Sequence, residues 1–150
     1  MAHSRPASET APRQIEIFEQ EGVDLSRVQI AHTGDTDDLD YIERVLDKGV
    51  FIGMDRFGLA LFLPDEKRIP TVLALLERGY AERMFLSQDF CSSIDWFPVE
   101  VQEYLKANEV PDWSMTFLFE KVIPELKERG MTDEQLDQMM VANPKAWLGR

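Results

Sequence analysis

The chain has little of what several functional classes require. One cysteine in 150 residues rules out an internal disulfide and is typical of a reducing compartment. No apolar run approaches the roughly 20 residues of a membrane span, and the start Met1-Ala2-His3 does not resemble a signal peptide. Lys and Arg number 16 against 28 Asp and Glu, and this net charge of -12 argues against nucleic acid or an anionic membrane as partner. We therefore expect a cytoplasmic protein.

What the chain does contain fits one folded unit. Its residues are 44% hydrophobic and 29% charged, which is the range of a soluble globular domain that can bury a core. Four segments with helical patterns end in charged residues followed by a glycine, which readily takes the left-handed conformation that ends a helix. These glycines are Gly22, Gly49, Gly79 and Gly130. We expect the last of these helices to bury a stripe made of Phe119, Val122 and Leu126.

Three of the four glycine stops lead into short apolar runs that predict strands at 28–31, 50–54 and 84–87. Apolar residues through most of each run are typical of parallel strands that are covered on both faces. The order helix, glycine, strand and loop therefore predicts an α/β fold, either doubly wound or a barrel. Gly34 and Gly58 stand alone in their loops, so the sequence shows no glycine-rich phosphate-binding fingerprint. Thr36-Asp37-Asp38 is expected to cap the helix that follows it.

Both histidines of the chain and one aspartate stand where metal ligands would be expected. His32 closes a predicted strand, Asp89 follows another, and His3 lies near the amino terminus. Because the carboxyl ends of parallel strands meet on one face, where catalytic groups gather, a metal site is the first hypothesis. The alternatives are that His32 is an ordinary hydrogen-bonded histidine and that Asp89 caps a helix or a loop.

Three more residues near these positions allow two interpretations each. Arg56 either forms an ion pair with the adjacent Asp55 or donates to a substrate carbonyl or phosphoryl oxygen. Trp96 either anchors its loop or lines an apolar pocket. Cys91 has no histidine near it in the sequence, so inert packing is favoured over a nucleophilic role.

Several motifs, in order along the chain, resemble the phosphotriesterase-like lactonases of the amidohydrolase superfamily. The resemblance runs from His3 to Asn143-Pro144, which is nearly the whole chain. Its motifs are Ala31-His32-Thr33-Gly34-Asp35-Thr36-Asp37-Asp38, Gly53-Met54-Asp55-Arg56-Phe57-Gly58, Ser87-Gln88-Asp89-Phe90-Cys91 and Ile94-Asp95-Trp96. The second of these is more similar to the lactonases than to the dedicated phosphotriesterases.

The resemblance implies a (βα)8 TIM barrel that holds two divalent metal ions and opens lactones, acyl-homoserine lactones among them, with promiscuous hydrolysis of phosphotriesters. It implies that His3 and His32 are ligands of one metal and that Asp89 is a ligand of the other. Asp89 would also accept a proton as hydroxide attacks, and Arg56 and Trp96 would shape the substrate pocket. Imidazole and carboxylate ligands suit zinc, with iron, cobalt or manganese as alternatives.

Two parts of that family's metal site have no counterpart in the sequence. The family's first strand carries a His-x-His pair and its fourth a carboxylated lysine that bridges both metals, whereas no histidine remains here for the pair and no lysine falls at a predicted strand end. We therefore expect residues 1–150 to be the carboxyl-terminal half of a barrel, its last four βα units, with the first of their strands mostly missing.

These absences leave two functional hypotheses open. In the first, the chain belongs to a metal-dependent hydrolase acting on a small-molecule lactone or phosphotriester, completed by a separate amino-terminal half or present in a homodimer, as in intact family members. In the second, the chain is a catalytically inactive remnant that serves as an interaction or structural module.

Overall fold

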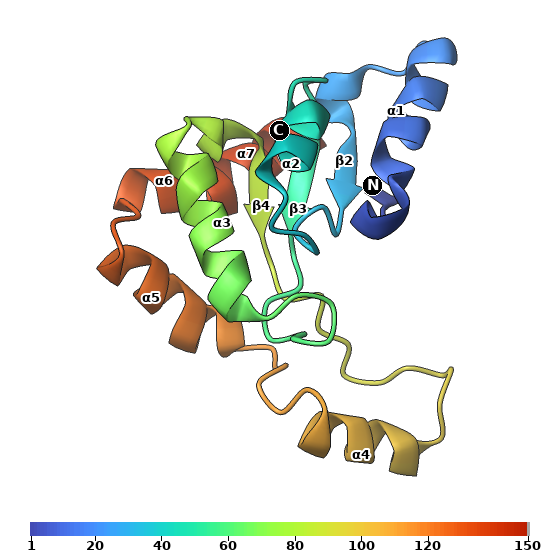
Figure 1. Ribbon diagram of the computed structural model, residues 1–150, viewed down its shortest axis with the longest axis vertical. Helices are drawn as coiled ribbons and strands as arrows, with labels where there is room; N and C mark the ends of the chain where they lie inside the picture. The colour runs from blue at the N-terminus through green and yellow to red at the C-terminus, as the bar shows by residue number, and fades with distance from the viewer. Residues whose placement is uncertain (150) are drawn as a thin grey trace.

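A computed structural model describes residues 1–149, and its centre is a parallel sheet (Figure 1). The strands are β1 Ala2–His3, β2 Gln29–Ala31, β3 Phe51–Met54 and β4 Met84–Leu86. They pair in parallel in the order β1-β2-β3-β4, so that spatial order follows sequence order. This confirms the α/β class and the three predicted strands, and it shows that the two residues before Ser4 already pair as a strand.

Seven α-helices and several shorter turns connect and follow the strands in residues 1–149. The helices are α1 Thr10–Gln20, α2 Leu39–Leu46, α3 Asp65–Glu77, α4 Val99–Asn108, α5 Ile123–Glu128, α6 Asp133–Asp137 and α7 Asn143–Leu148. The four predicted glycine stops all have positive φ, from +70° at Gly22 to +114° at Gly130, which confirms them. Asp38 accepts a hydrogen bond from the Tyr41 amide at 3.0 Å, so the predicted cap is also present.

The prediction that the last of these helices buries Phe119, Val122 and Leu126 is wrong at one position. Val122 and Leu126 are buried, but Phe119 is 58% exposed and Leu118 is buried in its place. The reason is a π-helical segment at Leu118–Val122, whose wider turn rotates the chain by about one residue relative to an α-helix.

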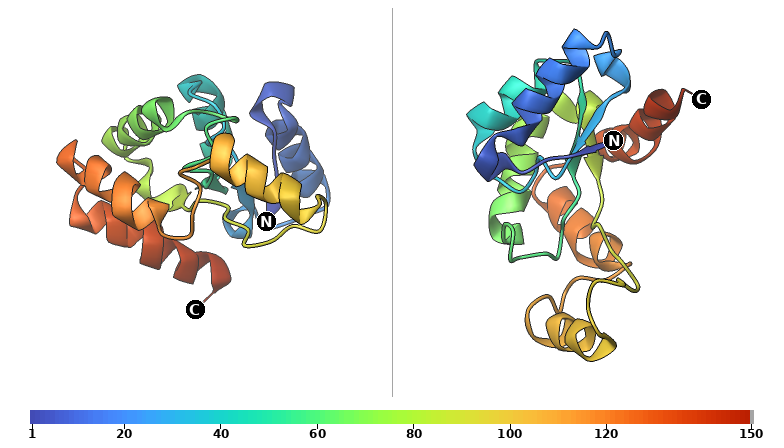
Figure 2. Two further views of the ribbon diagram at one scale, coloured as in Figure 1. Left: turned by 90° about the horizontal axis from the view of Figure 1, so that it is seen from below. Right: turned by 90° about the vertical axis from the view of Figure 1, so that its right-hand side faces the viewer.

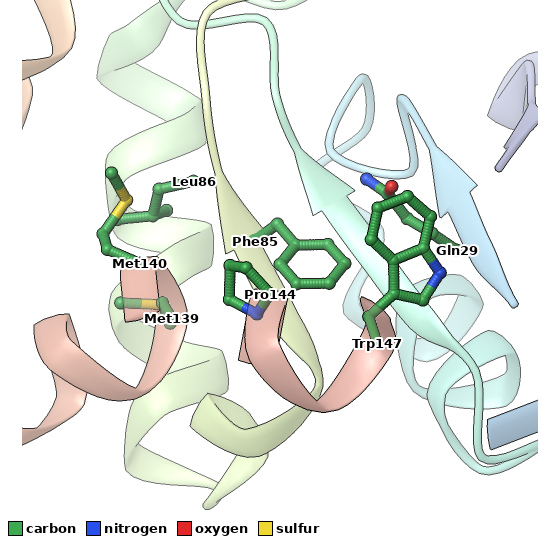
Figure 3. A pocket seen from close by; sticks show the side chains of 7 residues that line it. All are labelled: Gln29, Phe85, Leu86, Met139, Met140, Pro144 and Trp147. Atoms are coloured by element: carbon green, nitrogen blue, oxygen red, sulfur yellow. The ribbon is translucent and has the colours of Figure 1, made fainter. Parts of the chain in front are cut away.

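Helices cover the two faces of the sheet unequally. In the right-hand view of Figure 2, α1 and α2 lie on one side of the strands and α7 on the other. The hydrophobic core includes Ile30, Ile52 and Met54, which are all buried on the side of the sheet that faces α1 and α2. On the opposite side Trp147 packs against Phe85, with ring centroids 5.8 Å apart (Figure 3). The core therefore holds the strands in place from one face, and their carboxyl ends remain free for a site.

The connection between β4 and the last helices is the longest in the molecule. This long loop, residues 87–117, carries α4, which lies well away from the sheet (Figure 1). No residue of α4 is buried. Among the described residues, the structure contains no helix with the length and apolar character to cross a membrane.

Candidate functional site

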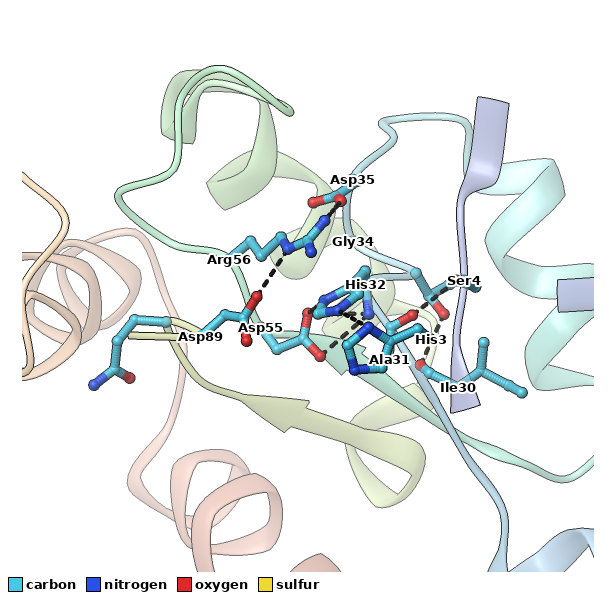
Figure 4. A network of polar contacts seen from close by, with 12 residues as sticks. His3, Ser4, Ile30, Ala31, His32, Gly34, Asp35, Asp55, Arg56 and Asp89 are labelled. Carbon is cyan, nitrogen blue, oxygen red and sulfur yellow. Dashed lines mark hydrogen bonds and ion pairs between the residues drawn. The ribbon is translucent and has the colours of Figure 1, made fainter. Parts of the chain in front are cut away.

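Neighbouring strands bring the two histidines side by side. His3 ends β1 and His32 follows β2, and the pairing of His3 with Ala31 places them at the same edge of the sheet. Nδ1 of His3 lies 3.3 Å from Nε2 of His32, and the rings meet edge to face at an interplanar angle of 87° (Figure 4). The two imidazole nitrogens therefore lie within hydrogen-bond distance of each other at the strand ends.

Asp55, which follows β3, fixes the orientation of His32. Its carboxylate accepts from the His32 backbone amide at 3.0 Å and lies 3.0 Å from the ring Nδ1. We assign the ring proton to Nδ1, where it can be donated to Asp55, so that Nε2 carries the free lone pair. A Cβ at Gly53 would overlap the Asp55 carboxylate, which explains why glycine stands there. The alternative that Asp55 forms an ion pair with the adjacent Arg56 is wrong, because both make their ion pairs elsewhere.

Arg56 joins two carboxylates from neighbouring loops. Its Nη1 donates to Asp35 Oδ2 at 2.7 Å and its Nε donates to Asp89 Oδ2 at 3.0 Å (Figure 4). Burial acts to lower the pKa of Arg56, but the hydrogen bonds that it donates to Asp35 and Asp89, together with their negative charges, outweigh this effect and the pKa is raised. Arg56 is thus a fixed positive charge between two acids at the strand ends.

The two strand-end residues His32 and Asp89 share an unusual backbone conformation. Their φ angles are +62° and +51°, in the left-handed region that side chains other than glycine rarely adopt. Such a conformation costs on the order of 1–2 kcal/mol per residue and persists where its surroundings enforce it. The Asp55 contact to the His32 amide is one such constraint. Strain of this kind gathers at functional sites, which supports a functional role for both residues.

The same residues border a cleft. Its volume is about 550 Å³, within the range of roughly 300–1,000 Å³ that is typical of small-molecule sites. His3, Arg56 and Asp89 lie on its polar side. Trp96 lines it from the long loop but is 85% exposed, so it does not anchor that loop. Cys91 lines the same cleft with its thiol free, and its side chain is half-buried.

A narrower groove continues from this cleft beneath α4. It has a volume of about 130 Å³ and shares Leu59, Cys91, Ile94 and Trp113 with the cleft. The rest of its lining is mostly apolar. An extended apolar group therefore has a place to lie beside the polar end of the cleft.

The histidine pair fits a metal ion better than the whole predicted ligand set does. Two imidazole nitrogens bound to one tetrahedral zinc lie about 3.4 Å apart, close to the 3.3 Å between His3 and His32. Asp89 lies at the same edge of the sheet but bonds to Arg56. Within residues 1–149, no group of three His, Cys, Asp or Glu side chains is close enough to hold an ion. The ligand roles of His3, His32 and Asp89 and the pocket roles of Arg56 and Trp96 thus remain predictions.

Three residues of this site were given no site role from the sequence. Asp35 and Arg68 carried no signal, because a charged residue in a loop or an amphipathic helix usually faces solvent. For Asp55 the sequence indicates only an ion pair with its neighbour Arg56. Its position directly after a strand, like that of His32, is the signal that could have identified it.

Comparison with known proteins agrees with these motifs. Residues 1–148 match the model of the phosphotriesterase family. An aryldialkylphosphatase from Saccharolobus solfataricus is 43% identical over 145 residues, which are 97% of this chain and 46% of that protein. The structure of a phosphotriesterase from Mycobacterium tuberculosis matches with a TM-score of 0.90 at 40% identity, over 96% of this chain and 43% of that one.

A variant of a lactonase from Deinococcus radiodurans that is described as phosphotriesterase-like matches with a TM-score of 0.82 at 34% identity. The match covers 91% of this chain and 43% of that one. The chain thus spans less than half the length of each of these relatives. The family match extends over nearly every residue of the chain and agrees with the resemblance that the strand-end motifs indicate. The chain belongs to the phosphotriesterase family.

Proposed function

We propose that the chain is part of a metal-dependent hydrolase that opens lactones and hydrolyses phosphotriesters more slowly. The observation that carries this proposal is the convergence of the His3 and His32 nitrogens, 3.3 Å apart, at the strand ends that also bear Asp89 and Arg56. The similarity to an aryldialkylphosphatase and to a phosphotriesterase-like lactonase supports both substrate classes.

The residues of the chain fit one metal ion directly and a second in part. His3 and His32 would hold one ion, and Asp89 would contribute to the other, with two ions in an intact site. Zinc suits these ligands best, and iron, cobalt or manganese are alternatives. A divalent metal supplies a hydroxide nucleophile near neutral pH and polarises the oxygen under attack. Asp55 would keep the His32 Nε2 lone pair available and aim the ring, as carboxylates behind metal-binding histidines do.

Asp89 would take the proton that is released during attack. Hydrogen bonds within residues 1–149 use one lone pair of its Oδ2, which accepts from Arg56, and leave the other lone pair of Oδ2 and both of Oδ1 for the metal and the proton. Arg56 holds the carboxylate still, and because it also pairs with Asp35 its charge stays balanced when Asp89 is protonated.

The apolar groove suggests which lactones are bound. A lactone ring near His3 and Arg56 would let an acyl chain run past Cys91 and Ile94 toward α4. We therefore propose acyl-homoserine lactones as the substrate class, with Trp96 as part of the wall that senses the chain. Buried apolar surface contributes about 0.8 kcal/mol per methylene, so chain length would affect the rate strongly.

In this proposal the rest of the site comes from outside residues 1–150. We propose that the four parallel strands are the last four of a (βα)8 barrel. They would be completed either by a separate amino-terminal half or within a longer chain that forms a homodimer. Both β1 and β4 are edges of the described sheet and can accept another strand. The free thiol of Cys91 agrees with a cytoplasmic location.

A second candidate function is an inactive remnant that acts as an interaction or structural module. It is favoured by the lack of a three-ligand group within residues 1–149 and by the missing His-x-His pair and bridging lysine. The two candidates differ in one measurable property, which is turnover once the remaining strands are present.

The experiment is to coexpress the chain with the amino-terminal half of a family member and to assay the purified complex with zinc. We expect hydrolysis of a lactone series and of one phosphotriester. Asp89→Asn should lower kcat/KM by more than about 100-fold on both substrates, because the proton acceptor is lost. Asp37→Asn, which affects only an exposed ion pair with Lys67, is the matched control and should retain activity. A well-folded, metal-loaded complex without turnover would favour the remnant instead.

A further inference from the structure

We propose that Arg68 is a positioning residue that acts through Asp35 and Arg56 on Asp89. The contacts themselves stand on the described structure, whereas the consequence for hydrolysis rests on the proposed function. Arg68 lies in α3 and is completely buried, and it lines neither the cleft nor the adjoining pocket around His3 and His32. It therefore cannot touch a substrate and would have to act through its neighbours.

The guanidinium of Arg68 ties together the loops that follow β2 and β3. Its Nη1 donates to the Gly34 carbonyl oxygen and lies 3.3 Å from Asp35 Oδ1, both in the first loop. Its Nη2 donates to the Leu63 carbonyl oxygen at 3.0 Å, in the second. The first loop begins directly after His32 and the second contains Arg56. One side chain thus sets the spacing of the two loops that carry the site.

Asp35 passes this constraint to the cleft. Its Oδ1 faces Arg68 and its Oδ2 accepts from Arg56 Nη1, so each oxygen of the carboxylate has its own cation. The Nε of Arg56 in turn donates to Asp89. Charges alternate along the series Arg68, Asp35, Arg56 and Asp89, and each member limits the rotation of the next.

The loop after β2, to which Arg68 is hydrogen-bonded, is also packed closely against the sheet. A Cβ at Gly34 would lie 2.9 Å from the sulfur of Met54, so its backbone is seated directly on β3. The Gly34 amide donates to the Gly53 carbonyl oxygen at 3.0 Å on one side, while Arg68 takes its carbonyl on the other. Asp35, the next residue, therefore starts from a fixed point.

Stability alone gives a poor reason for an arginine at this position. Burial lowers the pKa of Arg68 against the opposing effect of Asp35 and Asp65, which shows that the charge is costly to hold there. Among residues 1–149 its Nε has no hydrogen-bond partner, and the Oδ1 of Asp65 lies 3.6 Å away. Apolar residues of similar size often replace buried ion pairs with no loss of stability. The gain that offsets this cost is the fixed position of Asp35.

The test uses the chain itself and NMR of the Arg56 side chain. Hydrogen exchange at Arg56 Nε–H reports its bond to Asp89, which Arg68 does not touch. Arg68→Lys keeps the charge but cannot reach both loops, and we expect it to speed this exchange about 10-fold. Arg78→Lys, in an exposed pair with Glu43 at the end of the same helix, is the matched control and should leave the exchange unchanged. Unchanged exchange in folded Arg68→Lys would overturn the proposal.

Asp35→Asn provides a second route if Arg68→Lys does not fold. It keeps the size of the side chain and removes the charge that joins the two arginines, so the same faster exchange is expected. Where Arg68→Lys does fold, adding it to Asp35→Asn should have no further effect on this exchange, because the coupling runs through Asp35. Arg56 exchange that is unaffected by Asp35→Asn would overturn the proposal without any variant at Arg68.

In the completed barrel, Arg68→Lys should lower kcat for a lactone and a phosphotriester by the same factor of about 10, with KM little changed. The reason is that Asp89 serves both reactions and does not bind the leaving part of either substrate. Failure of the proposed function would appear as absent turnover in every variant while the NMR result still held. An unchanged kcat in an active complex, with faster Arg56 exchange, would overturn the positioning role.

Discussion

The two sides of the cleft differ in how the fold holds them. One side is supported by a polar floor, made of Arg56, which lines the cleft, and of Asp35, Asp55 and Arg68 behind it. Ion pairs and hydrogen bonds join these residues to the strand ends. The other is the long loop, whose Trp96 and Tyr104 are 85% and 60% exposed and whose helix α4 buries nothing. Each residue of the floor has fixed partners, whereas the long loop presents apolar side chains to solvent.

This difference suits two separate tasks, which are to hold reactive groups in fixed positions and to select among substrates. Catalytic groups need positions held to a fraction of an ångström, which buried hydrogen bonds to rigid strands provide. A wall that selects among substrates can vary without moving those groups. The two ends of the long loop are nevertheless joined to each other, where Gln88 donates to the Met115 carbonyl oxygen and accepts from Trp113 Nε1 at 2.7 Å. Its two ends are therefore fixed beside Asp89, and the segment between them is free to vary.

The largest effect on stability is expected from the floor. Asp55→Ala leaves the buried His32 amide and ring nitrogen without their acceptor, which should lower the free energy of unfolding by about 3 kcal/mol. Urea denaturation at pH 7 measures this value. Asp37→Ala removes an exposed ion pair and should cost less than about 1 kcal/mol. Equal losses in the two variants would remove the distinction between the floor and the surface.

The strands and the ends of the helices follow from short-range sequence signals. Apolar runs identify β2 to β4, and the glycines after the helices take the positive φ that their position predicts. Phe119 is the exception, because the π-helical turn that exposes it precedes Pro124 and has no periodic signature. A pattern based on 3.6 residues per turn cannot anticipate a change of the period itself.

The site is only half predictable for a related reason. His3, His32, Arg56 and Asp89 stand at strand ends, and the parallel order of the sheet brings them together. The partners of Arg56 come from different loops, with Asp35 21 residues away and Asp89 33 residues away along the chain. Which of several acids an arginine pairs with depends on loop conformation, and no local pattern encodes it. For the same reason Arg68 could not be distinguished from a surface charge.

A smaller effect is expected in how the free energy of unfolding depends on pH, which should differ between the half-buried Asp65 and the exposed Asp37. Burial raises the pKa of Asp65, despite its hydrogen bond from the Gly58 amide and the charge of Arg68. The folded state therefore takes up this proton at higher pH than the unfolded state, so the contribution of Asp65 to stability rises as the pH falls through the interval between the two pKa values. Relative to Asp65→Asn, the protein should gain stability as the pH falls from 7 toward about 4.

Asp37 provides the opposite case. Its hydrogen bond with Lys67 lowers the pKa, so its stabilising contribution is present above the pKa of the unfolded state and is lost as the pH falls toward the lower pKa of the folded state. Unfolding curves for Asp65→Asn, Asp37→Asn and the parent chain, measured from pH 7 to well below the ordinary aspartate pKa of about 3.9, compare the two. Differences of the same sign for both variants would contradict this assignment.

The smallest effect on stability is expected in the long loop, at Trp96. Because its side chain is 85% exposed, Trp96→Ala should change the free energy of unfolding by less than about 0.5 kcal/mol. Trp113→Ala is the matched comparison, since Trp113 donates to Gln88 and meets Phe90 edge-on at 5.3 Å, and it should cost about 2 kcal/mol. In the completed barrel, Trp96→Ala should shift the ratio of kcat/KM between long-chain and short-chain lactones by about 10-fold, because it alters a wall and leaves the floor intact. A large loss of stability in Trp96→Ala, or an equal loss of rate on every substrate, would assign Trp96 to the support of the loop.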